Sequence, residues 1–392
     1  MTTSITHAGH RPARKRGAER PAWMKAVSPP RGWFGDYVCQ ELNVAVNQAG
    51  AVFTHLRYSA MYCEQVERGL WSIGLSDGRC LYAPLVILAV GNTPRRTGGF
   101  PGLRSPDARV LHAWDLQSQP PRPDADVLIV GTGLSMVDAL LTLERHDHRG
   151  HIHAVSRNGL IPQAHSDDHG CCEPLTSVGL RALMRELRGG VEEARRTGRP
   201  WQWRMDAARH QAQALWRGLT IPERQRFLRH ARSYWDAHRH RIAPEVALQL
   251  NALKDRGRLT IHKGRIGEIR ATSAALEVAL REVGGNQSIQ AVHCVISSLG
   301  FELDPRRGDS PLLHNLLRTG VARPGMAGLG LRTDELGRLQ SAGGRTWSSL
   351  FALGSLRVGE LWESIAAHEI QQQAIELAEH LARRQVRYPI SV

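Results

Sequence analysis

Residues 127–143, VLIVGTGLSMVDALLTL, decide the fold of this chain. Four apolar residues in a row predict a buried parallel strand, and a glycine-rich turn follows directly. After the turn, apolar side chains recur at helical spacing; they are Met136, Val137, Leu140, Leu141 and Leu143. A short strand is expected at residues 151–155. The region therefore predicts one βαβ unit of a nucleotide-binding α/β domain.

The glycine turn is the predicted cofactor-binding loop. Its residues are Gly131, Thr132, Gly133, Leu134 and Ser135. Glycine permits a tight turn and lets the backbone approach a pyrophosphate, while the following helix offers unpaired N–H groups to an anion. Met136 stands where a third glycine is usual, so we expect the helix to pack less closely on the strand. The alternative is a turn with a purely structural role.

The strand after this loop ends in Ser156 and Arg157, which predict the choice of cofactor. Domains that bind NAD usually place Asp or Glu here, to accept hydrogen bonds from the ribose hydroxyls. Arginine cannot accept these bonds, but it pairs well with a ribose 2′-phosphate. The pattern therefore indicates NADP(H). The alternative is a solvated arginine, because all but four of the 51 basic residues are arginines.

Two further segments, residues 70–91 and 276–300, share one plan: a hairpin leads into a buried apolar strand that ends in glycine. In the first segment, Asp77-Gly78 predicts the hairpin turn, and residues 85–90 predict a parallel strand covered on both faces. Gly91 and Gly300 end the two segments. Such an element usually closes a dinucleotide-binding domain. Two copies with one glycine loop predict an α/β chain with two Rossmann-like domains, one of which lacks its N-terminal loop.

The remaining segments complete the expected organisation. Residues 1–30 are basic, rich in Ala, Arg and Pro, and without periodicity, so they predict a disordered leader. Residues 175–256 are Arg-rich and amphipathic, and they predict a helical insertion. Four other elements are expected: a helix at 33–46, a strand at 51–56, a strand at 350–353 and a helix at 362–384.

Charge and hydropathy exclude several classes of protein. The formal net charge of +14 attracts phosphates non-specifically. No helix-turn-helix and no aromatic pattern in a basic strand accompanies it, so we expect no nucleic-acid partner. No apolar run has membrane-spanning length, and the N-terminus lacks the apolar core of a signal peptide. We expect a cytoplasmic protein without membrane contact.

Neither a metal site nor a redox dithiol is predicted. His146, His148, His151 and His153 lie close together in the sequence, but their spacing matches no zinc pattern. The six cysteines form no Cys-x-x-Cys pair, so we expect reduced thiols. No hydrolase motif stands out either, and the sequence identifies no catalytic residue.

Four stretches together resemble the bacterial FAD/NAD(P)-binding protein family, flavoproteins with two dinucleotide folds. These stretches are 127–143, 156–165 (SRNGLIPQAH), 226–244 (RFLRHARSYWDAHRHRIAP) and 352–381. The resemblance runs from about residue 31 to the C-terminus. It implies an outer FAD-type domain at 31–122 and 295–392, and an inserted NAD(P)-binding domain at 123–294 that includes the helical insertion.

The same resemblance implies a second set of cofactor-binding residues. Gly91 and Gly300 would lie where the chain crosses between the two domains. Gly354, Trp362 and Glu363 would lie near the flavin, with the last helix directing its N-terminus at the ring. Such a helix would stabilise negative charge on a reduced flavin.

This chain departs from the family pattern at its start. Family members begin with a strand, a glycine fingerprint and an acidic ribose-binding residue, and residues 1–30 contain none of these. The outer domain is therefore predicted to be incomplete at its N-terminus. FAD is expected only if the rest of that domain suffices to hold it.

Three functions follow as hypotheses. The first is an FAD/NAD(P)-dependent oxidoreductase, of the monooxygenase or reductase type, in which NADPH passes hydride to the flavin and a small molecule is the substrate. The second is a truncated, catalytically impaired remnant that binds NADP(H) only. The third is a basic protein whose helical insertion binds nucleic acid or a protein partner. The sequence does not determine the oligomeric state.

Overall fold

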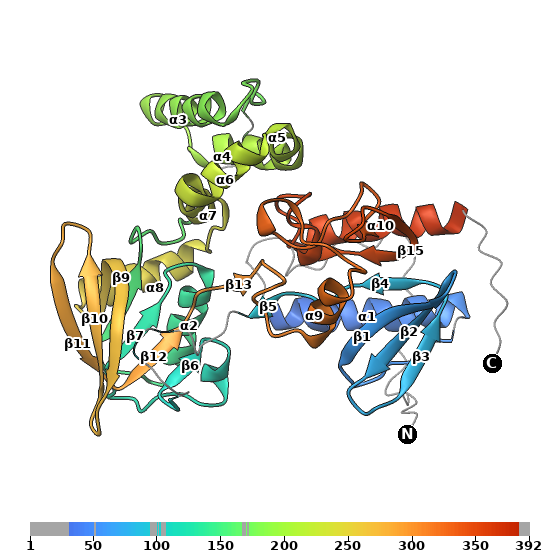
Figure 1. Ribbon diagram of the computed structural model, residues 1–392. Helices are drawn as coiled ribbons and strands as arrows, with labels where there is room; N and C mark the ends of the chain where they lie inside the picture. The colour runs from blue at the N-terminus through green and yellow to red at the C-terminus, as the bar shows by residue number, and fades with distance from the viewer. Residues whose placement is uncertain are drawn as a thin grey trace. The chain divides into compact units, whose positions relative to one another are not determined.

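The computed structural model describes residues 31–50, 52–94, 100, 102, 107–166, 170 and 172–383, so the predicted leader at 1–30 lies outside the described residues. The chain divides into two units, Met1–Ser59 and Ala60–Val392. Figure 1 shows their helices and strands.

The first unit contains helix α1 (Arg31–Ala49), which confirms the helix predicted at 33–46. Its apolar residues Trp33, Phe34 and Tyr37 are about half exposed. The strand predicted at 51–56 is wrong: residues 52–57 form no strand, and almost all of them are exposed. Apolar residues alone do not make a strand, because a strand needs a hydrogen-bonded neighbour.

The second unit contains a seven-stranded inner sheet, in the order β11-β10-β9-β8-β7-β12-β6. Its strands are β6 (Val110–His112), β7 (Val127–Val130), β8 (Ile152–Ser156), β9 (Leu259–Ala271), β10 (Leu276–Glu282), β11 (Gln287–Val292) and β12 (Cys294–Ser297). Neighbouring strands are parallel across β6, β12, β7, β8 and β9. The pairs of β9 with β10 and of β10 with β11 are antiparallel. The predicted βαβ unit is therefore confirmed, with β7 between β8 and β12.

Both faces of the inner sheet are covered. Helices α2 (Leu134–Arg145) and α8 (Pro244–Asp255) pack on one face, where Met136 and Leu250 contact the cluster around Ile129. On the other face Leu128 belongs to a cluster with Leu276 and Val278 of β10. All four residues of β7 are buried as a result. The parallel strand predicted from VLIV is thus covered on both sides.

The inner sheet reaches beyond the predicted limits of 123–294, because β6 and β12 hydrogen-bond into it from either side in the sequence. Helix α8 packs on this sheet, so the helical insertion itself consists of the elements before it. They are α3 (Leu180–Arg196), α4 (Gln202–His210), α5 (Ala212–Gly218), α6 (Ile221–Arg226), the π-helix Phe227–Ala231 and α7 (Arg232–Arg239). The division into cofactor-binding domains stays a prediction.

The outer part of the second unit has smaller sheets. The predicted hairpin is confirmed as β2 (Leu70–Leu75) and β3 (Cys80–Ala83), with β1 (Ala60–Glu67) beside β2. A second three-stranded sheet has the order β14-β15-β4. Its strands are β14 (Arg338–Gln340), β15 (Thr346–Ala352) and β4 (Val86–Leu88). Helix α9 (Pro311–Arg318) packs with these sheets around Trp71 and Leu350.

Strand β4 differs from the expectation for residues 85–90. It pairs parallel with β15, as predicted, with Val86 opposite Leu350. Its other edge has no partner strand among the described residues, and Ile87 is 40% exposed. The expectation of cover on both faces is therefore wrong, because burial alternates along β4: Leu88 is buried on one face and Ile87 is exposed on the other.

The last helix, α10 (Ala367–Arg383), begins later than the predicted residue 362. Glu363 has a φ of +68°, which a right-handed helix does not allow, so the chain turns here before α10 starts. None of the described helices has the length and apolarity needed to cross a membrane.

Candidate functional site

The predicted glycine loop lies between the end of β7 and the start of α2. Gly131 has a φ of +106°, and a Cβ atom on it would lie 2.3 Å from the carbonyl oxygen of Ser298. Only glycine fits this position, because both the backbone angle and the close approach exclude a side chain. The loop thereby turns tightly against the end of β12.

Gly133 has a different role, because it is the N-cap of α2 and has an ordinary φ of −86°. No atom lies within 4 Å of the place where its Cβ would be, so the space beside it is open. Leu134 and Ser135 open the helix, where backbone N–H groups have no acceptor within the helix. The first turn contains no acidic residue. This helix end can accept an anion at close range.

Thr132 and Ser156 hold the loop in place. The Thr132 hydroxyl lies 2.7 Å from the Ser156 hydroxyl oxygen and also contacts the Leu160 carbonyl oxygen. The Ser156 hydroxyl oxygen accepts a hydrogen bond of 3.1 Å from the Gly159 N–H. The structure thus brings the two predicted segments, 131–135 and 156–157, together through buried or half-buried hydroxyl groups.

Arg157 directly follows β8 and is exposed. It forms no hydrogen bond or ion pair with a residue that the structure describes, so its guanidinium is available to a ligand. Lys263, also exposed, lies opposite Ser156 on β9. Sequence reasoning missed Lys263, although it is one of only four lysines in the chain. Two cationic residues therefore lie on neighbouring strands here, Arg157 directly after β8 and Lys263 on β9.

The three predicted glycines of the outer part all have positive φ: 69° at Gly91, 74° at Gly300 and 67° at Gly354. The Gly91 carbonyl oxygen accepts a hydrogen bond from the Ser355 hydroxyl, and the Gly354 N–H donates one of 3.1 Å to Gln373. The first bond joins the ends of β4 and β15, and the second ties the end of β15 to the last helix.

The two predicted crossings also lie side by side. Strand β5 (Thr93–Pro94) follows Gly91 and strand β13 (Phe301–Glu302) follows Gly300. These strands pair antiparallel, with Phe301 opposite Pro94 and Glu302 opposite Thr93. The chain therefore leaves the outer sheets and returns to them at the same place.

Glu363 is buried, and residues of the helical insertion hold its carboxylate. Trp235 donates a hydrogen bond of 2.7 Å to it, and Arg239 forms an ion pair with it at 3.0 Å. Burial lowers the pKa of Arg239, and the charge of Glu363 acts against that shift. The sequence singles out the dense run of aromatic and charged residues at 234–241, which predicts either the lining of a substrate or cofactor cleft or a helix surface, but it does not identify Trp235 and Arg239 as partners of Glu363.

Trp362, the residue before Glu363, also contacts the helical insertion. Its ring stacks on that of Trp216, with centroids 4.8 Å apart, and meets the ring of Phe227 edge-on at 5.4 Å. Trp216 in turn donates a hydrogen bond of 3.0 Å to the Gly359 carbonyl oxygen. Among the described residues, no hydrogen bond or ion pair joins Trp362 or Glu363 to the glycine loop. The predicted cofactor residues thus form two groups, one at the inner sheet and one in the outer part.

Of the histidines singled out in the sequence, His153 is part of a hydrogen-bond chain. The Nδ1 atom of His153 lies 3.0 Å from Nε2 of His262, whose Nδ1 lies 3.1 Å from a Glu282 carboxylate oxygen. Burial, with the nearby His151 and His262, lowers the pKa of His153 to about 4. Among the described residues no three His, Cys, Asp or Glu side chains are arranged to hold a metal ion. The described cysteines are free thiols.

The sequence model of a family described as FAD-NAD(P)-binding matches residues 6–93. The match begins inside the predicted leader and ends just beyond Gly91. No curated protein sequence matches the chain.

Several solved structures share the fold. An ornithine hydroxylase from Pseudomonas aeruginosa is 18% identical, with a TM-score of 0.60, covering 91% of this chain and 76% of that one. An ornithine N-hydroxylase from Kutzneria sp. 744 is 14% identical, with a TM-score of 0.55, covering 90% and 83%. A bacillithiol disulfide reductase from Bacillus cereus is 13% identical, with a TM-score of 0.51, covering 89% and 78%.

These likenesses concern the fold, and they bear on two of the predictions. The predicted fold class, α/β with Rossmann-like dinucleotide folds and a helical insertion, is confirmed. The predicted resemblance of this chain to FAD/NAD(P)-binding flavoproteins with two dinucleotide folds is confirmed as well.

Proposed function

We propose that the chain is an NADPH-dependent flavin oxidoreductase, in which the loop 131–135 and Arg157 hold NADP(H). The observation that carries the proposal is the open N-terminus of α2, together with Arg157 after the next strand, which pairs with no residue in the described ranges. The open space at Gly133 leaves room for a pyrophosphate. The first turn of α2 contains no acidic residue, so no negative side chain there opposes the attraction of the helix N-terminus for this anion. Arg157 stands at the end of the next strand, where the ribose of the bound nucleotide is recognised.

The residues present fit NADP(H) better than NAD(H). A guanidinium can donate two parallel hydrogen bonds to a ribose 2′-phosphate. Lys263 would add a second positive charge on the neighbouring strand. The ribose hydroxyls of NAD(H) would need a carboxylate acceptor, and Arg157 occupies the position where that acceptor is usual. We therefore propose a preference for the phosphorylated cofactor.

The proposal of FAD rests on the outer part of the chain. The family model that matches residues 6–93 is described as FAD-NAD(P)-binding, and the solved structure of the Kutzneria hydroxylase holds reduced FAD, NADP+ and L-ornithine. When bound, a flavin accepts a hydride from NADPH and passes electrons to oxygen or to a small organic acceptor.

In this chain Gly91, Gly300 and Gly354 would allow close approach of the backbone to the flavin, because each has a positive φ. Trp362 and Glu363 precede α10, whose N-terminus would favour negative charge at the ring. Trp235 and Arg239 would fix Glu363 without touching the cofactor.

A second candidate function is NADP(H) binding without a flavin. The free edge of β4 favours it, because the outer sheet has three strands in the described residues while the inner sheet has seven. A flavin nucleotide would have fewer contacts on the smaller sheet. The two candidates share the site at Gly133 and Arg157, and they differ only in the outer part.

The test is a visible absorption spectrum of the purified 392-residue chain before and after addition of NADPH, combined with calorimetric titration of NADPH and NADH. A yellow protein that bleaches with NADPH agrees with the oxidoreductase. A colourless protein that binds NADPH and is not reconstituted by FAD agrees with the second candidate. Failure to bind NADPH at all would contradict both.

A further inference from the structure

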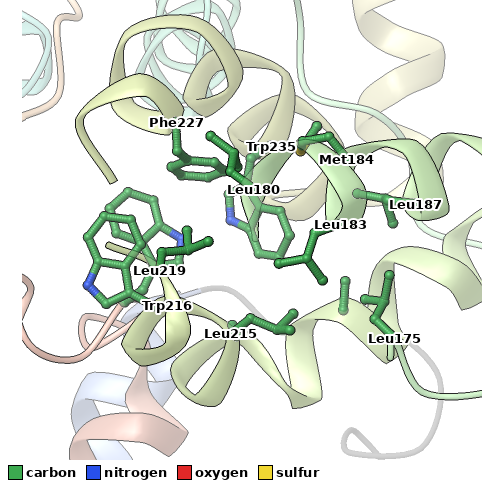
Figure 2. A pocket seen from close by; sticks show the side chains of 13 residues that line it. Leu175, Leu180, Leu183, Met184, Leu187, Leu215, Trp216, Leu219, Phe227 and Trp235 are labelled. Carbon is green, nitrogen blue, oxygen red and sulfur yellow. The ribbon is translucent and has the colours of Figure 1, made fainter. Parts of the chain in front are cut away.

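Trp114 differs from the other tryptophans of the second unit in its exposure. It is 51% exposed, whereas every other tryptophan that the structure describes in this unit is buried or half-buried. Figure 2 shows two of these, Trp216 and Trp235, packed with leucines of the helical insertion. Single exposed apolar residues are common on protein surfaces, so the place of Trp114 in the fold decides whether its exposure has a function.

Trp114 lies at the same edge of the inner sheet as the glycine loop. It follows the carboxyl end of β6 by two residues, and the glycine loop follows the carboxyl end of β7. Both strands run parallel to β12, which lies between them, so their carboxyl ends lie at one edge. Neighbouring strands are about 4.8 Å apart, which places the two strand ends roughly 10 Å from each other. Ligands of open α/β sheets bind at this edge.

Three neighbours hold the indole of Trp114 at this edge. The His112 ring meets it edge-on, with centroids 4.8 Å apart, and His112 Nδ1 accepts a hydrogen bond of 3.3 Å from the Trp114 backbone N–H. The Phe301 ring is tilted by 46° against the indole, with centroids 5.5 Å apart. Leu116 is fully buried in the cluster around Ile129 and anchors the chain two residues further on. Neither neighbouring ring is parallel to the indole, so no described ring is stacked on it.

The order of the strands indicates which end of a dinucleotide reaches Trp114. In the inner sheet β8, β7, β12 and β6 lie side by side in this order. The proposed pyrophosphate site is the glycine loop after β7, and Arg157, the proposed contact of the 2′-phosphate, follows β8. In NADP(H) the pyrophosphate lies between the adenosine and the nicotinamide ribose. An extended cofactor whose adenosine end lies at β8 therefore directs its nicotinamide ring past β12 toward β6.

We infer that Trp114 binds the nicotinamide ring of NADP(H) by stacking, an inference that rests on the proposed function. The planar ring would lie against the exposed part of the indole, where contact between aromatic rings is favourable. The oxidised nicotinamide carries a positive charge, which adds a cation–π attraction to the indole. His112 and Phe301 are positioning residues, because they hold the indole and need not touch the cofactor.

The test compares NADP+ with 2′-phospho-ADP-ribose, which is the same molecule without its nicotinamide ring. Calorimetric titration of the full chain gives both affinities. The unaltered chain should bind NADP+ about tenfold more tightly, the combined worth of an aromatic contact and a cation–π attraction. Equal affinities would overturn the inference, and this comparison needs no variant.

Two variants assign the difference to Trp114. Trp114→Ala should weaken NADP+ binding about tenfold and leave 2′-phospho-ADP-ribose binding unchanged. Trp114→Phe keeps an aromatic ring, so its loss should be less than about threefold. Circular dichroism shows whether each variant folds. Undiminished NADP+ binding to folded Trp114→Ala would overturn the inference, and so would an equal loss of both ligands.

Tyr82→Ala is the matched control, since Tyr82 is an exposed aromatic residue on β3 in the outer part. It should bind both ligands like the unaltered chain, and a selective loss of NADP+ affinity as large as that of Trp114→Ala would overturn the inference. The proposed function has its own readout, because Arg157→Ala should weaken both ligands through their shared 2′-phosphate. If Arg157→Ala weakens both and Trp114→Ala weakens neither, the NADP(H) site stands and the role of Trp114 fails. An unaltered chain that binds neither ligand would overturn both proposals.

Discussion

Strands β7 and β4 have nearly the same kind of sequence, VLIV and VIL, but different surroundings. β7 lies between two parallel neighbours, under helices on one face and a strand layer on the other, and all its residues are buried. β4 has one neighbour and an exposed isoleucine. An apolar run therefore specifies a strand and its parallel pairing, but its burial depends on what the rest of the fold supplies.

The strongest test of this contrast is one substitution made in both strands. Ile129→Ala in β7 removes a fully buried side chain and should lower the free energy of unfolding by about 3 kcal/mol, within the range for such cavities. Ile87→Ala in β4 should cost less than about 1 kcal/mol, because the side chain is already 40% exposed. Chemical denaturation followed by circular dichroism measures both. Equal losses would mean that Ile87 is covered in solution.

The next effect concerns Arg157, which gives the inner sheet its proposed phosphate contact. Arg157→Ala should weaken NADPH binding about 30-fold, since a charge-assisted hydrogen bond is worth about 2 kcal/mol, and should leave NADH binding unchanged. The matched control is Arg318→Ala, at an exposed arginine on α9 in the outer part. Calorimetric titration measures both cofactors. A parallel loss of NADH affinity would show that Arg157 supports the fold and does not select the phosphate.

A smaller effect is expected at Gly133. Its ordinary φ and the empty space around it mean that Gly133→Ala should lower the free energy of unfolding by no more than about 1 kcal/mol, the cost of a poorer N-cap. The added methyl group would occupy the place proposed for the pyrophosphate, so NADPH affinity should fall roughly tenfold, about 1.4 kcal/mol. Gly343→Ala, at an exposed glycine of ordinary φ in the outer part, is the control. Undiminished NADPH binding in Gly133→Ala would place the nucleotide elsewhere.

The smallest effect is a pH dependence of the inner sheet. The pKa of His153 is lowered from 6.5 to about 4 in the folded chain, first by burial and then by His151 and His262. As pH falls below 6.5, the unfolded chain takes up this proton before the folded chain does. The contribution of His153 to the free energy of unfolding is therefore fully present above pH 6.5, and it declines as the pH falls toward 4.

His153→Leu should reduce this decline, and denaturation midpoints at pH 7 and pH 5 measure it. Part of the decline will remain in the variant, because burial also lowers the pKa of His112, His148 and His165. An unchanged difference between the two pH values would show that His153 titrates normally.

Much of the inner sheet could be predicted from the sequence because its signals are local. A strand, a glycine turn and a helix within seventeen residues fix each other's geometry, and the loop at Gly131 formed as expected. The hairpin at Asp77-Gly78 is local in the same sense. The strand expected at 51–56 failed because no partner strand could be read from the residues themselves.

The surroundings of Trp362 and Glu363 could not be predicted for a similar reason. Their partners Trp216, Trp235 and Arg239 lie more than a hundred residues earlier in the chain. The late start of α10 depends on the turn at Glu363, and a φ of +68° at a glutamate leaves no sequence signal. Lys263 could be identified as part of the candidate site only from the pairing of β8 with β9, which places it opposite Ser156. Long-range pairing, more than residue type, separates what the sequence predicts from what it does not.

The short pair of β5 and β13 has a practical meaning for protein engineering. Because the chain leaves the outer sheets at Pro94 and returns at Phe301 on the adjacent strand, the two ends of the intervening segment lie side by side. A short linker in its place would close the outer part without stretching the backbone. Close ends of this kind are what makes domains exchangeable between chains.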